Sequence, residues 1–297
     1  MFNTAIRRFF TSARPESLKK KQNFLSYTIK SQGKIKLIDV GCNDGLLLEQ
    51  CSMERYEVYG LEPSEAGEIA SQKGFHVIRN FLTAESGQFA YESIGPLNVV
   101  VVTNVLAHVP NIENFVQGIT NLLDQGGFWV VEFPYVLDML QNLTFDTVYH
   151  EHFSYLSISP LLPLFNKLGL WVVGIKKCEV GGSGPYLRLT CIKGKGEDFA
   201  SRQDTVTRKY TLYEQIIGHS KLPLYLNFAE SVKRYKDLLI KNIEILLESN
   251  EKLGGYGAPA KGNTLLNYLN LNSNHLVAIA DNTIEKIYNI FKNKYKY

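Results

Sequence analysis

Hydrophobic and polar residues alternate along the first half of the chain in blocks that suit strands and helices in turn. Five short runs, rich in β-branched and other apolar residues, lie at 35–40, 56–61, 75–78, 97–102 and 128–132. Segments with helical spacing of apolar residues separate them and begin near Gly45, Ser64, Thr83 and Asn111. This strand–helix rhythm predicts a mostly parallel sheet with helices on both faces.

The pattern changes after about residue 140. An apolar helical stretch at 159–168 precedes two strand-like runs, 170–176 and 186–192, which a glycine-rich turn joins. Strands that follow each other so closely predict an antiparallel hairpin at the edge of the sheet. Residues 194–202 are polar and are predicted to form a linker, whereas apolar positions at helical spacing predict one long helix over 224–252. A helical stretch at 264–271 and a strand at 275–280 then begin a smaller α/β unit.

Composition supports a globular protein. Of the 297 residues, 45% are hydrophobic and 21% are charged, and the apolar runs are too short to span a bilayer. Residues 1–36 hold nine Lys/Arg and one acid, a net charge of +8 against +3 for the whole chain, so the remainder carries −5. We therefore expect a small-molecule substrate, with no nucleic-acid or membrane partner, in a monomer or a dimer.

Charge and cysteine usage also bear on the compartment. Residues 1–15 contain arginine, hydroxyl and aromatic residues but no acid, a composition typical of a mitochondrial transit peptide. The main expectation is nonetheless a cytoplasmic protein with a solvated amino terminus. The four cysteines are far apart and form no CxxC pair, which predicts buried thiols and neither a zinc site nor a disulfide framework.

The first candidate site is the run IDVGCNDG at 38–45, after the first predicted strand. Glycines there let a loop approach a ligand beside a helix N-terminus, while the Asn-Asp pair favours a cationic or zwitterionic ligand over a diphosphate. Glu62 ends the second predicted strand, where it could accept both hydroxyls of a ribose. The arrangement resembles the S-adenosylmethionine site of class I methyltransferases, with Asp39, Gly41, Asn43, Gly45 and Glu62 as cofactor-binding residues.

Two further motifs carry polar side chains. Asn104 and His108 follow the fourth predicted strand, at the edge where open α/β sheets bind ligands, although a lone histidine is as often structural. The tetrapeptide Tyr-His-Glu-His at 149–152 packs two imidazoles, a carboxylate and a phenol into four positions. Because histidine takes and returns a proton near neutral pH, this segment predicts acid/base chemistry. A metal site through its histidines lacks a third ligand, and a structural aromatic cluster is the other interpretation.

Together these motifs resemble the S-adenosylmethionine-dependent sugar C-methyltransferases, which act on nucleotide-linked keto-deoxysugars. The resemblance covers about residues 36–281 and rests on IDVGCNDG (38–45), NVLAHVPN (104–111), EFPY (132–135), YHEHFSYLS (149–157), GGS (181–183) and GYGAPAKGNTLLNY (255–268). It implies a Rossmann-like sheet plus a partial second α/β domain, without the family's amino-terminal zinc domain. The expected regions are a basic extension at 1–33, a cofactor-binding domain at 34–195 and a truncated carboxyl-terminal domain at 196–297.

The resemblance also implies roles for individual residues. His152 would remove the proton from the carbon to be methylated, Glu151 would orient it, and Tyr149 and His108 would donate hydrogen bonds to the enolate. Asn104 would lie by the cofactor and the sugar, and His150 would be structural. Tyr256, Lys261 and Asn263 would help hold the nucleotide sugar. The alternatives are a class I methyltransferase acting on oxygen or nitrogen, and a remnant that binds the cofactor or a partner without turnover.

Overall fold

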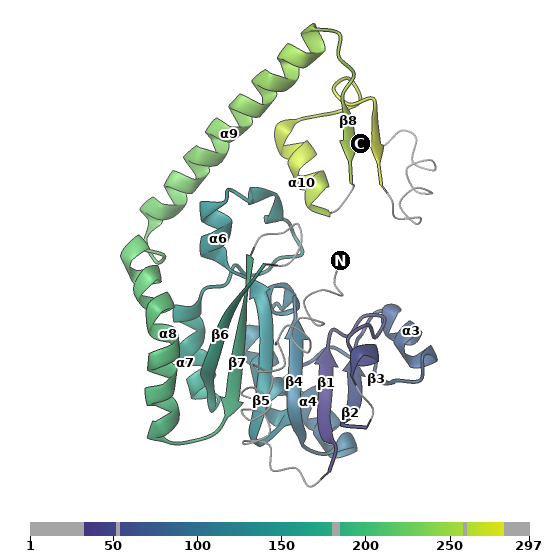
Figure 1. Cartoon of the computed structure of the whole chain (residues 1–297), viewed down its shortest axis with the longest axis vertical. Helices are drawn as coiled ribbons and strands as arrows, with labels where there is room; N and C mark the ends of the chain where they lie inside the picture. The colour runs from purple at the N-terminus through teal and green to yellow at the C-terminus, as the bar shows by residue number, and fades with distance from the viewer. Residues whose placement is uncertain (1–32, 52–53, 180–184, 258–259, 282–297) are drawn as a thin grey trace, which may run out of the picture. The chain divides into compact units, whose positions relative to one another are not determined.

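The computed structural model describes residues 33–51, 54–179, 185–257 and 260–281, which fall into two compact units (Figure 1). Unit 1 comprises the described residues of Met1–Asp138 together with Phe153–His219. Unit 2 comprises Met139–His152 and the described residues of Ser220–Tyr297. The predicted basic extension and the GGS turn lie outside the described residues, apart from Gly33. None of the described helices combines the length and the hydropathy that a membrane span requires.

Unit 1 is built on one seven-stranded sheet in the order β3-β2-β1-β4-β5-β7-β6. Its strands are β1 (Ile35–Val40), β2 (Tyr56–Leu61), β3 (His76–Ile78), β4 (Leu97–Thr103), β5 (Leu123–Pro134), β6 (Leu170–Glu179) and β7 (Pro185–Lys193). β1 to β5 run parallel, whereas β7 pairs antiparallel with both β5 and β6. The predicted α/β fold, a mostly parallel Rossmann-like sheet with an antiparallel edge hairpin, is confirmed.

Helices accompany the sheet of unit 1: α3 (Ala66–Gln72), α4 (Ala84–Ile94), α5 (Ile112–Leu122), α7 (Ile158–Lys167) and α8 (Glu197–Ile217). α4 and α5 pack on each other, and α7 and α8 pack against β6. Two predicted helix starts are confirmed by their caps. The hydroxyl of Thr83 accepts the N–H of Ser86 at 3.1 Å, and the side chain of Asn111 accepts the N–H of Asn114 at 3.0 Å.

The helix predicted near Gly45 is wrong. That segment holds only a short 3₁₀ helix, η1 (Leu48–Gln50), whose last turn closes through the N–H of Cys51 and the carbonyl of Leu48 at 3.1 Å. Leu48 and Cys51 are both buried in the core beside β1 and β2. The tight 3₁₀ turn directs both side chains into the core, and apolar spacing over so few residues does not distinguish it from an α-helix.

The linker predicted at 194–202 is also wrong, because α8 begins at Glu197 and runs for 21 residues. The buried positions of α8 are polar: Gln203, Thr207 and Glu214. The side-chain oxygen of Gln203 accepts the N–H of Val172 on β6 at 2.9 Å. Hydrophobic spacing is the main sequence signal for a helix, so a helix that buries hydrogen-bonding side chains gives none.

Unit 2 joins two segments that are far apart in the sequence. The first, Met139–His152, begins within α6 (Val136–Gln141) and contains the 3₁₀ helix η3 (Phe145–Thr147). The second contains α9 (Leu222–Glu248), β8 (Gly254–Tyr256), α10 (Ala260–Leu269) and β9 (Ala278–Ala280), and β8 and β9 pair in parallel. The ring of Phe145 packs on Tyr268 of α10, with centroids 5.0 Å apart, and on Tyr235 of α9, at 6.2 Å.

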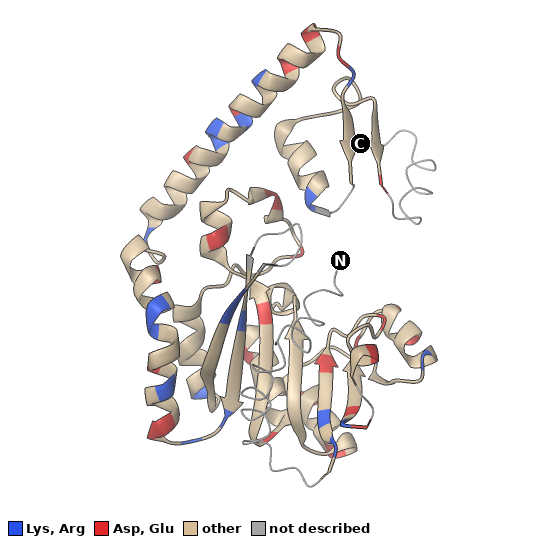
Figure 2. Cartoon of the chain, viewed as in Figure 1, with Lys and Arg blue, Asp and Glu red and all other residues tan. Residues whose placement is uncertain are grey.

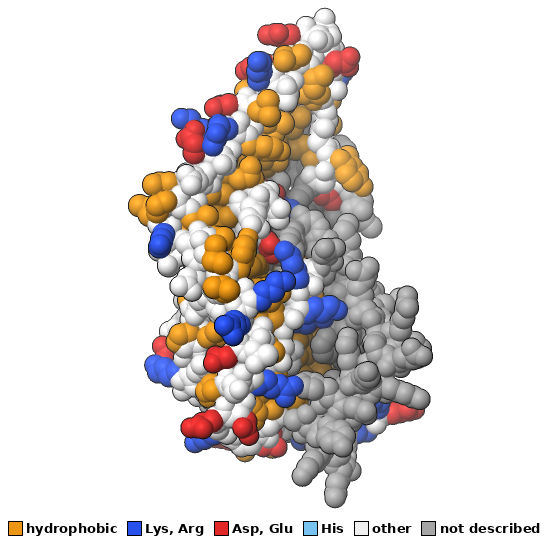
Figure 3. Space-filling model, turned by 60° about the vertical axis from the view of Figure 1, so that its left-hand side comes forward, with side chains coloured by type: hydrophobic (Ala, Val, Ile, Leu, Met, Phe, Trp, Pro, Cys, Tyr) orange, Lys and Arg blue, Asp and Glu red, His pale blue; other side chains and the backbone are white. Residues whose placement is uncertain are grey.

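The predicted long helix is present as α9, 27 residues in length. Val232 is its one fully buried residue among those described. Charged residues recur along α9 in Figure 2, and Figure 3 shows hydrophobic side chains between them. Because so little of α9 is buried, its helical form depends on its length and on its many leucine, lysine and glutamate residues, which favour helix.

Candidate functional site

The loop after β1 and the end of β2 meet at the carboxyl edge of the sheet. β1 lies between β2 and β4, so the strand order reverses here, which is where open α/β sheets bind ligands. Gly41, Asn43 and Gly45 all adopt left-handed backbone angles, with φ of 76°, 52° and 84°. The N–H of Gly41 donates to the carbonyl of Leu61 at 2.8 Å, which fastens the loop to β2 directly before Glu62.

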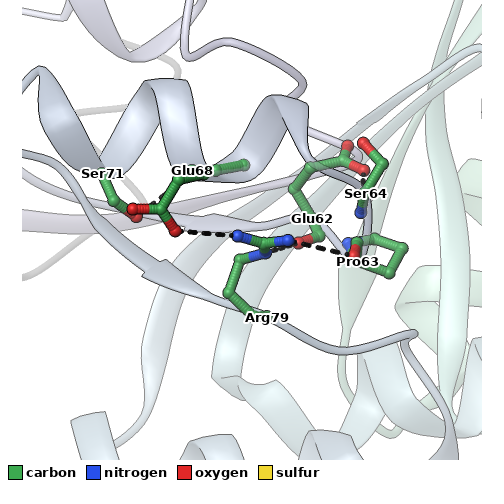
Figure 4. Close-up of polar contacts among 7 residues, drawn as sticks. Glu62, Pro63, Ser64, Glu68, Ser71 and Arg79 are labelled. Atoms are coloured by element: carbon green, nitrogen blue, oxygen red, sulfur yellow. Dashed lines mark hydrogen bonds and ion pairs between the residues drawn. The ribbon is translucent and has the colours of Figure 1, made fainter.

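Glu62 links the loop after β1 to the loop after β2, in which Glu62 itself lies. Its buried carboxylate accepts the N–H of Asn43 through Oε2 at 3.1 Å. It also accepts the N–H of Ser64 through Oε1 at 3.0 Å (Figure 4). The structure thus brings Asn43 and Glu62 into contact. An ionised carboxylate has about four acceptor positions, so each oxygen keeps capacity for a ligand hydroxyl.

Gly41 has little space beside it. A Cβ at this position would lie 2.4 Å from Cγ2 of Val105, in the loop after β4. A Cβ at Gly45 would lie 3.1 Å from the Cβ of Ala70 and 3.2 Å from the ring of Phe75. The glycines therefore serve both the left-handed backbone and the close packing of neighbouring segments.

Replacing Gly41 by alanine is expected to lower the free energy of unfolding by about 2–4 kcal/mol, through left-handed strain together with the overlap with Val105. Gly74→Ala is the matched control, because Gly74 has a φ of 92° but no atom within 4 Å of the added carbon. Strain alone should cost that variant about 1–2 kcal/mol. Urea unfolding of both variants measures the difference, and equal losses would show that the overlap with Val105 is unimportant.

Asp39 lies next to the last residue of β1 and is almost completely buried. Burial, together with the negative charge of Glu62, raises the pKa of Asp39 from 3.8 to about 8. A carboxyl that keeps its proton at neutral pH can donate as well as accept a hydrogen bond.

Asp39→Asn is expected to change the pH dependence of stability. The folded carboxyl keeps its proton to about pH 8, whereas the unfolded one loses it at about pH 4. The wild-type protein therefore loses stability as pH rises through this window, and asparagine, which does not ionise, removes the loss. Urea unfolding between pH 5 and 8 should favour the variant increasingly as pH rises. The exposed Glu54→Gln is the control, and parallel curves for wild type and Asp39→Asn would contradict the raised pKa.

Asn104 and His108 lie in the loop that follows β4. Asn104 has a φ of 58°, and its N–H donates to the carbonyl of Glu132 at 2.9 Å. Its side-chain oxygen is buried and has no hydrogen-bond partner within the part of the chain that the structure describes. His108 ends the 3₁₀ helix η2 (Leu106–His108) and is half-buried. A buried acceptor without a donor is costly, so the oxygen of Asn104 is suited to a ligand N–H.

These groups fit the expected methyl donor. Glu62 has acceptor capacity for the two ribose hydroxyls, and the orphan oxygen of Asn104 matches an ammonium group, which can only donate. Both side chains follow strands that neighbour β1 in the sheet. The residues present therefore suit S-adenosylmethionine, whose amino-acid end is zwitterionic and whose nucleoside end carries a vicinal diol.

The tetrapeptide at 149–152 belongs to unit 2. Tyr149 and His152 are ring neighbours, with centroids 4.5 Å apart, and the N–H of His152 donates to the carbonyl of Tyr149 at 3.0 Å. His150 and Glu151 are exposed, whereas His152 is half-buried. The turn thus separates the two histidines, with only His152 held against the protein.

Nδ1 of His152 lies 2.8 Å from the carbonyl oxygen of Thr147. A carbonyl can only accept, so Nδ1 carries the proton in this contact, and the neutral ring then has its lone pair on Nε2. This is the arrangement that a general base needs. Thr147 could not be found from the sequence, because its contribution is a backbone carbonyl.

The residues expected to hold the sugar also lie in unit 2. Tyr256 is in β8 with 85% of its surface exposed, while Lys261 and Asn263 are in the first turn of α10. The side-chain N–H of Asn267 donates to the side-chain oxygen of Asn263 at 2.9 Å. Because η3 packs against α10, the tetrapeptide at 149–152 and these residues belong to one unit.

Two charged residues that the sequence reasoning did not assign form a buried ion pair. Arg188 on β7 donates through Nε to Oε2 of Glu132 on β5 at 2.8 Å. Its terminal nitrogen Nη2 lies 2.6 Å from the same oxygen. The two residues are direct partners in the β5–β7 register. Glu132 and Arg188 each have apolar neighbours in their strands, and these isolated charges are the sequence signal that would have revealed the pair.

Arg79 is a further residue without a sequence assignment. Its guanidinium lies against the backbone of Glu62 and Pro63 (Figure 4). Arg79 directly follows β3, the strand that pairs with β2. A positively charged residue at the end of a strand beside β2 is the sequence signal by which Arg79 could have been found.

Comparison with known proteins shows which families the chain resembles. Residues 181–293 match the C-methyltransferase C-terminal domain family. The C-methyltransferase NovU of Streptomyces niveus is 29% identical over 84% of this chain and 59% of its own length. A ubiquinone biosynthesis O-methyltransferase of Caulobacter sp. strain K31 is 31% identical over 33% of this chain and 40% of its own length. The chain thus spans less than two thirds of each of these relatives.

Among solved structures, magnesium protoporphyrin IX methyltransferase from Synechocystis, with bound SAH, is 14% identical and covers 59% of this chain and 82% of its own, with a TM-score of 0.44. The methyltransferase-domain family matches residues 10–174, more than half of the sequence. The chain therefore belongs to the methyltransferase-domain family, and its cofactor is S-adenosylmethionine, as the sequence predicts.

Proposed function

We propose that this protein methylates a carbon beside a carbonyl group, in a nucleotide-linked keto-deoxysugar, through an enolate that His152 generates. The match to the C-methyltransferase C-terminal domain family and the similarity to NovU support carbon as the methyl acceptor. The observation that carries the proposal is the contact between Nδ1 of His152 and the carbonyl of Thr147. That contact leaves Nε2 as the basic nitrogen of a half-buried histidine.

The proposed reaction begins with proton transfer to Nε2 of His152. The electron pair of the broken C–H bond moves onto the carbonyl oxygen of the substrate, which becomes an enolate. Tyr149 and His108 are the proposed donors to that oxygen, and such donors lower the barrier because they act where negative charge develops. The imidazolium that forms keeps its Nδ1–H on Thr147, so the ring does not need to turn during the step.

Unit 1 holds the cofactor in this proposal. Glu62 accepts the ribose hydroxyls, Asn104 accepts an N–H of the amino-acid end, and Gly41, Asn43, Gly45 and Asp39 shape the loop between them. When bound, S-adenosylmethionine supplies an electrophilic methyl group for the enolate carbon. The protein's task is then to align the two reacting carbons, because correct positioning alone lowers the activation barrier by a large part.

The proposed contacts to the sugar lie in unit 2, the unit that also contains His152. Tyr256, Lys261 and Asn263 of unit 2 are the proposed contacts to the nucleotide sugar.

O-methylation is the second candidate. Its support is the similarity of about a third of the chain to ubiquinone biosynthesis O-methyltransferases. In that case His152 would deprotonate a hydroxyl in place of a C–H group.

Product analysis with methyl-labelled S-adenosylmethionine and a thymidine-diphosphate 4-keto-deoxysugar distinguishes the two. We expect the label on a ring carbon, together with exchange of the hydrogen on that carbon when the protein and the sugar are incubated in D₂O. Label on oxygen would replace the C-methylation proposal by the second candidate. Labelling of neither atom would reject this substrate class.

A further inference from the structure

The segment 66–79 runs from the start of α3 to the residue after β3, and it contacts both loops of the cofactor site. Arg79, directly after β3, donates through Nε to the carbonyl of Glu62 at 3.1 Å and through a terminal nitrogen to the carbonyl of Pro63 at 3.4 Å. Its other terminal nitrogen pairs with Glu68 on α3 at 3.1 Å. Figure 4 shows the guanidinium lying between Glu68 and the backbone of Glu62 and Pro63. One planar cation therefore spans α3 and the loop after β2.

Lys73 makes the corresponding contact to the other loop. At the end of α3, its Nζ donates to the carbonyl of Asp44 at 2.8 Å and pairs with Glu49 at 2.8 Å. Asp44 stands next to Asn43, whose N–H holds the carboxylate of Glu62. The loop after β1 is thus held by a cation from the same segment that holds the loop after β2.

Gly67 shows how closely this arrangement is packed. A Cβ at Gly67 would lie 2.9 Å from the carbonyl oxygen of Glu62 and 3.1 Å from Cδ of Arg79. Only glycine in α3 lets the aliphatic part of Arg79 pass alongside the carbonyl that its Nε binds. Arg79 and Gly67 together therefore fix where the backbone of Glu62 lies.

We infer that Arg79, assisted by Lys73, is a positioning residue of the cofactor site: it fixes the backbone of Glu62 and Pro63 so that the carboxylate of Glu62 faces the ribose diol. The inference rests on the cofactor-binding part of the proposed function. Arg79 contacts backbone atoms and acts through Glu62. Its planar fork reaches two carbonyls and one carboxylate at once, which the single ammonium of lysine cannot reproduce.

Isothermal calorimetry with S-adenosylhomocysteine on the full-length chain tests the inference. Arg79→Met should weaken binding by about tenfold, because the carbonyls of Glu62 and Pro63 lose the donor that holds them. Arg79→Lys should restore only part of the affinity, and Lys73→Met should lose less than Arg79→Met. Lys167→Met, which breaks an exposed ion pair between α7 and α5, is the matched control and should bind as the wild type does.

A double-mutant cycle separates positioning from a general loss of structure. In a Glu62→Gln background, Arg79→Met should change the affinity by less than about twofold, because the group through which it acts is already altered. Thermal unfolding identifies a variant that is merely unstable, and Gly67→Ala then supplies a second disturbance of the same contact. Additive losses in the cycle, or wild-type affinity in Arg79→Met, would overturn the inference. Wild-type protein that does not bind S-adenosylhomocysteine would instead reject the proposed cofactor site.

Discussion

His152→Ala is expected to reduce methyl transfer by about 10²–10⁴-fold while leaving the affinity for S-adenosylmethionine nearly unchanged. The reason is the contact between Nδ1 and the carbonyl of Thr147, which makes Nε2 the proton acceptor in the proposed mechanism. Alanine removes the base but does not touch the loops around Gly41 and Glu62. Single-turnover rates and calorimetry on the same preparation measure the two effects separately.

His150→Ala is the matched control for this result. His150 lies two residues before His152 in the same turn, but its side chain is exposed. We expect close to wild-type turnover from it, and loss of hydrogen–deuterium exchange at the substrate carbon from His152→Ala alone. Retained exchange in His152→Ala would show that another group is the base. Equal losses in both variants would show that the turn as a whole, and not one imidazole, supports the reaction.

The largest effect on stability is expected from Glu214→Ala, about 3–5 kcal/mol. Glu214 is completely buried on α8, and its Oε1 accepts the hydroxyl of Tyr135 at 2.9 Å and the N–H of Ile158 at 2.7 Å. Oε2 accepts both the N–H of Ser159, at 2.7 Å, and its hydroxyl. Burial and the carboxylate of Glu214 together raise the pKa of Tyr135. Alanine would leave all four donors without their acceptor inside the protein, at the first turn of α7.

Two further variants define this effect. Glu214→Gln keeps the shape but turns an N–H₂ group toward donors, so its loss should fall between wild type and Glu214→Ala. Asp204→Asn, an exposed acid on the same helix, should change the free energy of unfolding by less than about 0.5 kcal/mol. Chemical denaturation at neutral pH measures all three. A loss below about 1 kcal/mol in Glu214→Ala would mean that water replaces the carboxylate at little cost.

Apolar spacing predicted the sheet of unit 1 well, because its central strands β1, β4 and β5 are mostly buried on both faces and read as continuous apolar runs. It failed at α8, which buries Gln203, Thr207 and Glu214 against donors and acceptors. It also failed at β8, whose sequence is Gly-Gly-Tyr, because two glycines carry no strand signal. In both cases hydrogen bonding to a distant segment determines the element, and local sequence does not record that partner.

The candidate site shows the same limit. Asn43 and Glu62 follow neighbouring strands, so their contact could be foreseen from the order of the strands. The contacts of Arg79 depend on the path of the chain around α3 and on the space that Gly67 leaves. The carbonyl of Thr147 is a backbone group, which every residue has, so no sequence pattern could single it out.

The discontinuity of unit 2 has a consequence for the order in which the protein matures. Segments emerge from the ribosome amino-terminal end first, and folding follows that order. The turn with His152 is synthesised 116 residues before Tyr268, on which the ring of Phe145 packs. When Tyr268 is synthesised, β1 to β7 and the loops around Glu62 are already complete. A nascent chain, or one clipped within α9, would therefore form the loops around Glu62 before the segment with His152 gains its contact with α10. Under the proposed function, such a chain would bind the methyl donor without transferring the methyl group.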